Sequence, residues 1–126
     1  MSGCERFIGM RYRYGGDGSD GYIDCIHLVY GCLQVLKVPT PEFKESWYGA
    51  SAREVLKDIN SWGIRIERPR YDGDIIVLPD PETSWSFGVT WRTGLLTVHP
   101  SQRVIWTPST LVPISRAYRY CRTSGP

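Results

Sequence analysis

The run of residues that leads to Cys25 limits the fold of this chain more than any other part of it. Residues 12–24 read YRYGGDGSDGYID. Glycine tolerates positive φ angles, so residues 15–21 are predicted to form a loop. The segment that follows Cys25, residues 26–36, has a broad apolar face and is predicted to be a central buried helix. A cysteine at the first turn of a helix lies beside unpaired N–H groups, which is how a protein builds a thiol nucleophile.

Two other segments in the first half of the chain are predicted to be helical. Residues 3–11 are expected to form a short helix with three apolar side chains facing inward: Phe7, Ile8 and Met10. A second helix is expected to start at Ser51, because a serine cap followed three residues later by Glu54 fits the capping box. Two prolines, Pro39 and Pro41, are expected to end the central helix before it.

The second half of the chain changes to strand patterns. Residues 64–68 alternate between apolar and polar, and residues 74–78 form a short apolar run that is typical of a central strand. Four further strands are predicted, the first two as arms of a hairpin around Thr93-Gly94: residues 87–91, 95–99, 103–106 and 117–122. Helices followed by strands favour an α+β fold with a mostly antiparallel sheet of about five or six strands.

Length and charge narrow the class of protein. A chain of 126 residues is long enough for one domain with one core, so residues 1–126 are interpreted as a single domain. The net charge is +2 and no dense block of Lys and Arg occurs, so no nucleic-acid partner is expected. The arginine-rich stretch 116–122 is interpreted as a solvated strand face. No apolar run is long enough to predict a membrane span.

The four cysteines predict no metal site. Their spacing is irregular and contains no CxxC pair: Cys4, Cys25, Cys32 and Cys121. Free thiols are the expectation for a reducing compartment, and Cys32 is expected to be a small buried apolar residue. Thiol chemistry of the kind that Cys25 suggests needs no organic cofactor either, so cofactors are predicted to be none.

Three stretches together resemble the NlpC/P60 family of cysteine peptidases. Residues 9–29 read GMRYRYGGDGSDGYIDCIHLV, similar to a signature with a tyrosine, an aromatic-Gly-Gly loop, then a glycine and an aromatic residue before Asp-Cys-x-x-Leu-Val. Residues 71–78 (YDGDIIVL) resemble the family's Pro-Gly-Asp-Leu strand, and residues 86–89 (SFGV) resemble its His-Val-Gly-Ile element. The resemblance spans residues 5–120 and implies a papain-like NlpC/P60 fold, with N-terminal helices packed on the sheet.

The resemblance also implies roles for four residues. Family members usually cut the peptide stems of the bacterial cell wall: a thiolate attacks the amide carbonyl, a histidine shuttles the proton and a third polar residue orients the histidine. Matched position by position, Cys25 corresponds to the nucleophile and Tyr12 to the tyrosine near the thiol and substrate. Ser86 stands where the family has its proton-shuttling histidine. His99 falls near the orienting position on the next strand.

Ser86 departs from the family pattern, and three interpretations follow. A serine hydroxyl is not a useful base near neutral pH, and loss of a general acid–base typically costs about 10²–10⁴-fold in rate. In the first, the chain is a degenerate member of the family kept for shape or binding. In the second, His99 has become the base. In the third, His27 serves as the base instead. His27 lies two residues after Cys25, where helical side chains point to different faces, so a structural hydrogen bond is favoured. Asp24 is expected to cap the helix.

The segment after the central helix suggests a context. Residues 36–43 read LKVPTPEF and are followed by Trp47-Tyr48. This stretch resembles the branch of the family found in phage tails, where the domain is mounted at the tail tip, hub or baseplate. The resemblance implies two classes of partner, other tail and baseplate proteins and peptidoglycan stem peptides. The N-terminus has no apolar leader, so synthesis in the host cytoplasm is expected. The resemblance implies that the chain is then assembled into the virion.

The sequence thus leaves alternatives open. The first is a phage tail-tip or baseplate component that hydrolyses peptidoglycan peptides through the Cys25 thiolate. The second is a catalytically degenerate structural protein that caps or plugs the tail tube, or docks neighbouring subunits through an aromatic surface. The third is a soluble cytoplasmic amidase or transpeptidase-like enzyme on the same fold.

Overall fold

A computed structural model describes residues 3–38, 63–78, 86–111 and 116–120. In these ranges there is one α-helix, α1 (Cys25–Val35), and there are two 3₁₀ helices, η1 (Cys4–Phe7) and η3 (Ser109–Leu111). The strands are β1 (Arg11–Tyr12), β2 (Tyr22–Ile23), β3 (Gly63–Ile66), β4 (Ile75–Leu78), β5 (Ser86–Trp91), β6 (Gly94–Thr97), β7 (Ile105–Pro108) and β8 (Arg116–Tyr120). The predicted α+β class is confirmed.

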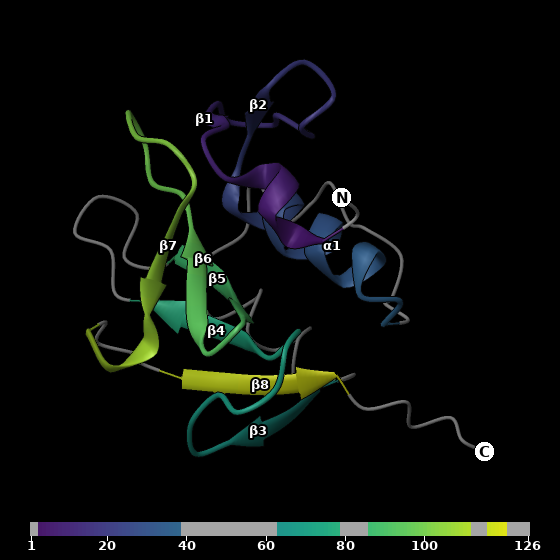
Figure 1. The fold of residues 1–126 in the computed structure, drawn as a ribbon, viewed down its shortest axis with the longest axis vertical. Helices are drawn as coiled ribbons and strands as arrows, with labels where there is room; N and C mark the ends of the chain where they lie inside the picture. Colours follow the sequence, from purple (N-terminus) through teal and green to yellow (C-terminus); the bar gives the residue numbers. More distant parts are fainter. Residues whose placement is uncertain (1–2, 39–62, 79–85, 112–115, 121–126) are drawn as a thin grey trace.

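The larger sheet has six strands in the order β3-β8-β4-β5-β6-β7, and every neighbouring pair is antiparallel. The mostly antiparallel sheet predicted from the sequence is therefore confirmed. A second, two-stranded sheet pairs β1 with β2 in parallel. This small sheet, which the strand patterns did not predict, lies at the end of the molecule where the loop before α1 begins (Figure 1).

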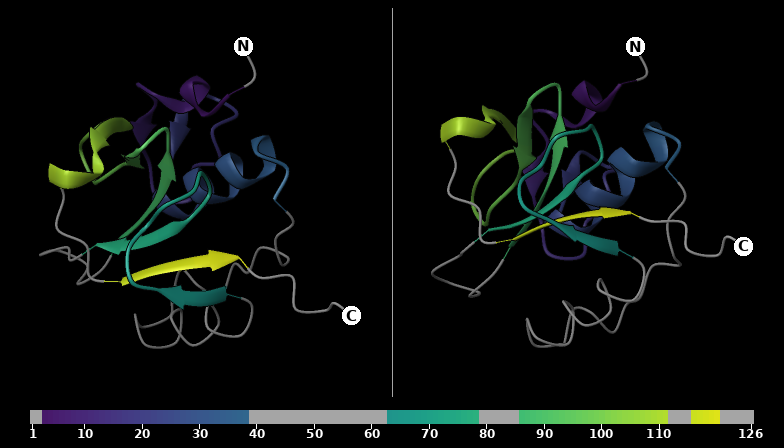
Figure 2. Two further views of the ribbon diagram at one scale, coloured as in Figure 1. Left: turned by 60° about the horizontal axis from the view of Figure 1, so that its bottom comes forward. Right: turned by 90° about the horizontal axis from the view of Figure 1, so that it is seen from below.

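The core lies between α1 and the larger sheet. Figures 1 and 2 show α1 and η1 on one side of β5 and β6, with β3 and β8 at the far end of the sheet. Side chains alternate along β4, because successive residues of a strand point to opposite faces. Ile75 and Val77 join the core cluster under α1, and Ile76 and Leu78 join a second cluster on the other face. This burial of β4 on both faces confirms its prediction as a central strand.

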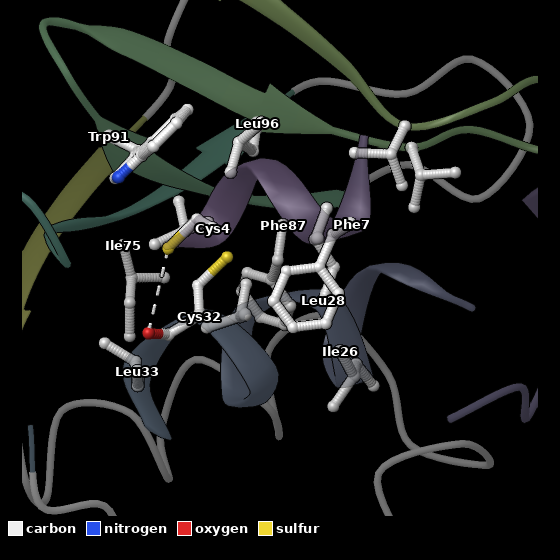
Figure 3. Packing of buried hydrophobic residues seen from close by; sticks show 14 of the residues in the cluster. Cys4, Phe7, Ile26, Leu28, Cys32, Leu33, Ile75, Phe87, Trp91 and Leu96 are labelled. Carbon is white, nitrogen blue, oxygen red and sulfur yellow. Dashed lines mark hydrogen bonds between the residues drawn. The ribbon is translucent and has the colours of Figure 1, made fainter. Parts of the chain in front are cut away.

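Two cysteines meet in the core between η1 and α1. Cys4 and Cys32 are both fully buried, and the Cys4 Sγ lies 4.0 Å from the Cys32 carbonyl oxygen (Figure 3). Cys32 is thus the small buried residue that the sequence predicts. The hydrogen bond with Cys4 and then burial raise the pKa of the Cys32 thiol. Of the cysteines that the structure describes, Cys4, Cys25 and Cys32 all have free thiols.

The N-terminal helix is shorter than predicted. It is a single 3₁₀ turn that ends at Phe7, and Ile8, expected to face inward, is 44% exposed. The helix ends there because the next residues bond to the loop before β7. The Gly9 N–H donates to the Val104 carbonyl at 3.0 Å, and the Val104 N–H donates to the Met10 carbonyl at 2.8 Å. The predicted helix from Ser51 lies outside the described residues.

The last strands are also shifted from their predicted bounds. β7 was predicted over residues 103–106 but covers Ile105–Pro108, since the backbone of Val104 is bonded to residues 9 and 10 rather than to β6. In β8 the Arg119 side chain is only partly solvated, because it forms an ion pair with the buried Asp74. This corrects the interpretation of the arginine-rich stretch as a purely solvated face. Within the described parts of the chain, no helix has the length and apolar character needed to cross a bilayer.

Candidate functional site

The loop before α1 depends on its glycines. Gly15, Gly18 and Gly21 have φ angles of +80°, +89° and +87°, a region that other residues adopt only with strain. At Gly16 the reason is space, since a Cβ there would lie 2.8 Å from the carbonyl oxygen of Tyr22. The predicted loop is therefore confirmed. Its tight turns return the chain to β1, so that β2 pairs with β1 directly before α1 begins.

Asp24 joins this loop to the helix. The residue is 2% exposed, and its Oδ1 accepts a hydrogen bond of 2.8 Å from the His27 N–H. Its Oδ2 accepts a second bond of 2.9 Å from the Gly15 N–H. Asp24 is thus the helix cap that the sequence predicts, because it satisfies one of the open N–H groups at the helix start. The same carboxylate fixes the position of the next residue, Cys25.

His27 is turned toward the cap. Its Nδ1 lies 3.0 Å from the Asp24 Oδ1, and its side chain is 23% exposed. This contact confirms the structural hydrogen bond that was favoured over a role as the base.

The Cys25 thiol lies against the first residues of β5. The Ser86 hydroxyl and the Phe87 backbone N–H both form hydrogen bonds to the sulfur that favour its thiolate. Ser86 itself is 4% exposed and pairs with Leu78 across the β4–β5 ladder, so the strand holds its position. The structure therefore brings together Cys25 and Ser86, two of the four residues singled out from the sequence.

Burial decides the charge of this thiol. The pKa of Cys25 is raised to about 11: burial and the Asp24 carboxylate raise it, and the hydrogen bonds from Phe87 and Ser86 lower it by less. The expectation that the helix terminus would stabilise a thiolate is wrong, because desolvation outweighs the favourable N–H groups. The protonated thiol makes its full contribution to the free energy of unfolding below its unfolded-state pKa near 9. This contribution is lost as the pH rises through the folded-state pKa of about 11.

Tyr12 and His99 are connected to each other through the backbone. Tyr12 pairs with Ile23 in the β1–β2 ladder and packs against the main core. Its N–H donates to the Gln102 carbonyl at 2.9 Å, and the Gln102 N–H donates to the His99 carbonyl at 3.0 Å. His99 was expected on a strand but follows β6, which ends at Thr97.

Neither histidine of the chain is among the main groups that set the pKa of Cys25.

The sequence matches no protein-family model. Comparison with curated proteins likewise gives no match. Among the residues that the structure describes, no group of three or more His, Cys, Asp and Glu side chains is arranged to hold a metal ion.

Some groups at the site could not be found from the sequence. The Phe87 N–H bonds to the Cys25 sulfur. It is a backbone group, so the residue type at position 87 does not indicate the contact. Arg11 and Arg103 face each other across an isolated antiparallel bridge although they are far apart in the chain. A pairing of this kind depends on the fold, and neither arginine carried a motif that could have indicated it.

Proposed function

We propose that this protein is a structural component of a phage tail tip or baseplate, built on an NlpC/P60-like fold that does not hydrolyse peptidoglycan. The fold rests on the sequence resemblance of residues 5–120, and the tail context rests on that of residues 36–43 and Trp47-Tyr48, most of which lie outside the described residues. The lack of hydrolysis rests on one observation, the pKa of Cys25, which is raised to about 11 although the Ser86 hydroxyl is bonded to the sulfur.

The chemistry of this pair supports the proposal. With a pKa near 11, only about one Cys25 in 10⁴ is a thiolate at pH 7. The Ser86 hydroxyl can donate a hydrogen bond to sulfur, but it cannot take up the thiol proton at neutral pH or deliver a proton to a leaving amine. Attack on an amide would therefore lack both its nucleophile and its acid.

One observation favours a second candidate, peptide hydrolysis with His99 as the base. The Gln102 N–H donates to the His99 carbonyl and the Tyr12 N–H donates to the Gln102 carbonyl, and these bonds attach the histidine loop to β1. β1 pairs with β2, which leads directly into Asp24 and Cys25. In this candidate the His99 imidazole would take the proton of the Cys25 thiol.

Release of muropeptides from host-type peptidoglycan, read by mass spectrometry, separates the two candidates. The purified protein is expected to release no more material than its Cys25→Ala variant. Release that disappears in Cys25→Ala would contradict the structural proposal, and loss of that release in His99→Ala would identify the base.

The tail context has its own readout. Mass spectrometry of purified virions is expected to detect the chain at a fixed ratio to the other tail proteins. A chain that is abundant in infected cells but missing from virions would contradict its placement in the particle.

A further inference from the structure

A small cavity lies beside β1, on the side of the loop that precedes β7. Its volume is about 400 Å³, within the range of roughly 300–1,000 Å³ typical of sites for small molecules. It is lined by Arg11, Tyr12, Tyr22, Ser101, Gln102 and Arg103. Two of these residues are cationic and none is acidic, so the cavity carries positive charge.

The two arginines are held opposite each other. Arg11 and Arg103 are partners in an isolated antiparallel bridge, and both side chains are exposed. Like charges directly opposite one another on paired strands destabilise the pair. An anion between the two guanidinium groups would remove this repulsion.

No described acidic side chain neutralises the pair. The ion pairs within the described ranges are Arg13–Asp20, His27–Asp24 and Arg119–Asp74, so neither cavity arginine forms one there. Asp20, on the loop that precedes β2, is bound to Arg13 at 2.6 Å. Within the described ranges the Arg103 guanidinium donates one hydrogen bond, of 3.1 Å to the Gly9 carbonyl, so most of its five N–H donors have no described protein partner.

The backbone around the cavity is fixed before any ligand arrives. The Tyr12 N–H donates to Gln102, the Val104 N–H to Met10 and the Gly9 N–H to Val104, all at 2.8–3.0 Å. These bonds tie β1 to the loop that carries Arg103. A site whose backbone is already in place loses less entropy on binding.

We propose that this cavity binds an oxyanion, a carboxylate or a phosphate group, between Arg11 and Arg103. Guanidinium groups recognise both anions through paired N–H bonds, and their planar shape favours oxyanions over halides. The inference goes beyond the proposed function, since it requires neither hydrolysis nor assembly into a tail. Tyr12 and Gln102 belong both to the cavity and to the backbone connection with His99.

The test is an NMR titration of the ¹⁵N-labelled protein with glutarate and, separately, with glycerol phosphate. Saturable shifts are expected at the amides of Arg11, Tyr12 and Gln102 for at least one probe. The probe that binds more tightly tells whether the site takes carboxylate or phosphate. Arg11→Gln is expected to weaken binding about tenfold or more, as is usual for loss of a charge-assisted contact. Raising the salt concentration should weaken it too.

Arg65→Gln is the matched control, because it removes the same charge from β3 at the opposite edge of the sheet. Arg103→Gln serves as a second variant, with the fold checked in each case by its NMR spectrum. Equal weakening by Arg65→Gln and Arg11→Gln would mean that only the net charge matters, and would overturn the inference. Shifts that do not saturate with either probe, or that centre elsewhere, would overturn it as well.

Discussion

Replacement of Ser86 by histidine is expected to lower the pKa of Cys25 from about 11 toward neutrality. An imidazolium beside the sulfur favours the thiolate, as in thiol enzymes that pair cysteine with histidine. The alkylation rate of Cys25 by iodoacetamide at pH 7 should then rise by roughly 100-fold or more, since the thiolate is the reacting form. Mass spectrometry of the peptide that contains Cys25 measures this rate.

Ser86→Asn is the control for this change. Asparagine brings a side chain of comparable polarity and greater size to the same buried position but no basic group, so the Cys25 rate should stay low. If the two variants are folded and react equally, or if Ser86→His reacts like the parent, the role assigned to position 86 is contradicted. Any gain in peptide hydrolysis by Ser86→His should also depend on Cys25.

Replacement of Asp74 by alanine is expected to lower the free energy of unfolding by about 3 kcal/mol, the lower end of the range for breaking a buried ion pair. Asp74 is 2% exposed. Its carboxylate accepts bonds of 2.9 and 3.0 Å from the Arg70 and Tyr71 N–H groups and two bonds of 3.0 Å from the Arg119 guanidinium. The lower end applies because the Arg119 side chain is 38% exposed and regains water. Urea denaturation measures the change.

Asp20→Ala gives the comparison for an exposed ion pair. Asp20 and Arg13 are about half exposed, and pairs of this kind contribute little to stability. The Asp20 variant should therefore unfold close to the parent, far from Asp74→Ala. If the two variants lose the same free energy of unfolding, the buried network around Asp74 does not hold β4 and β8 together.

The parts of the fold that the sequence predicts well are those set by local chemistry. The central helix was predicted over residues 26–36 and covers Cys25–Val35, because Asp24 caps it and its apolar face is broad. The hairpin of β5 and β6 was also predicted, but its turn is one residue earlier. Arg92 and Thr93 both have positive φ, at 53° and 58°, so the chain reverses before Gly94. Two-residue hairpin turns need this geometry, which usually selects Asn-Gly.

The parts that were missed depend on contacts between distant segments. The first helix stops at Phe7 because Gly9 and Met10 bond to Val104, and no local pattern contains that information. The thiol at the helix start suggested a stabilised thiolate, but its desolvation arises from the packing of α1 on β5. In contrast, the position of Ser86 beside Cys25 followed from the matched order of the motifs.

The pH dependence of Cys25 alkylation in the unmodified protein tests the central claim most directly. The rate at Cys25, resolved by mass spectrometry from those of the other cysteines, should be very low at pH 7 and should rise with a midpoint near pH 11, the raised pKa of this partly buried thiol. Such a profile means that Cys25 has no base beside it. A midpoint below about pH 8, as for a thiolate held by an imidazolium, would contradict the account and support a working cysteine peptidase.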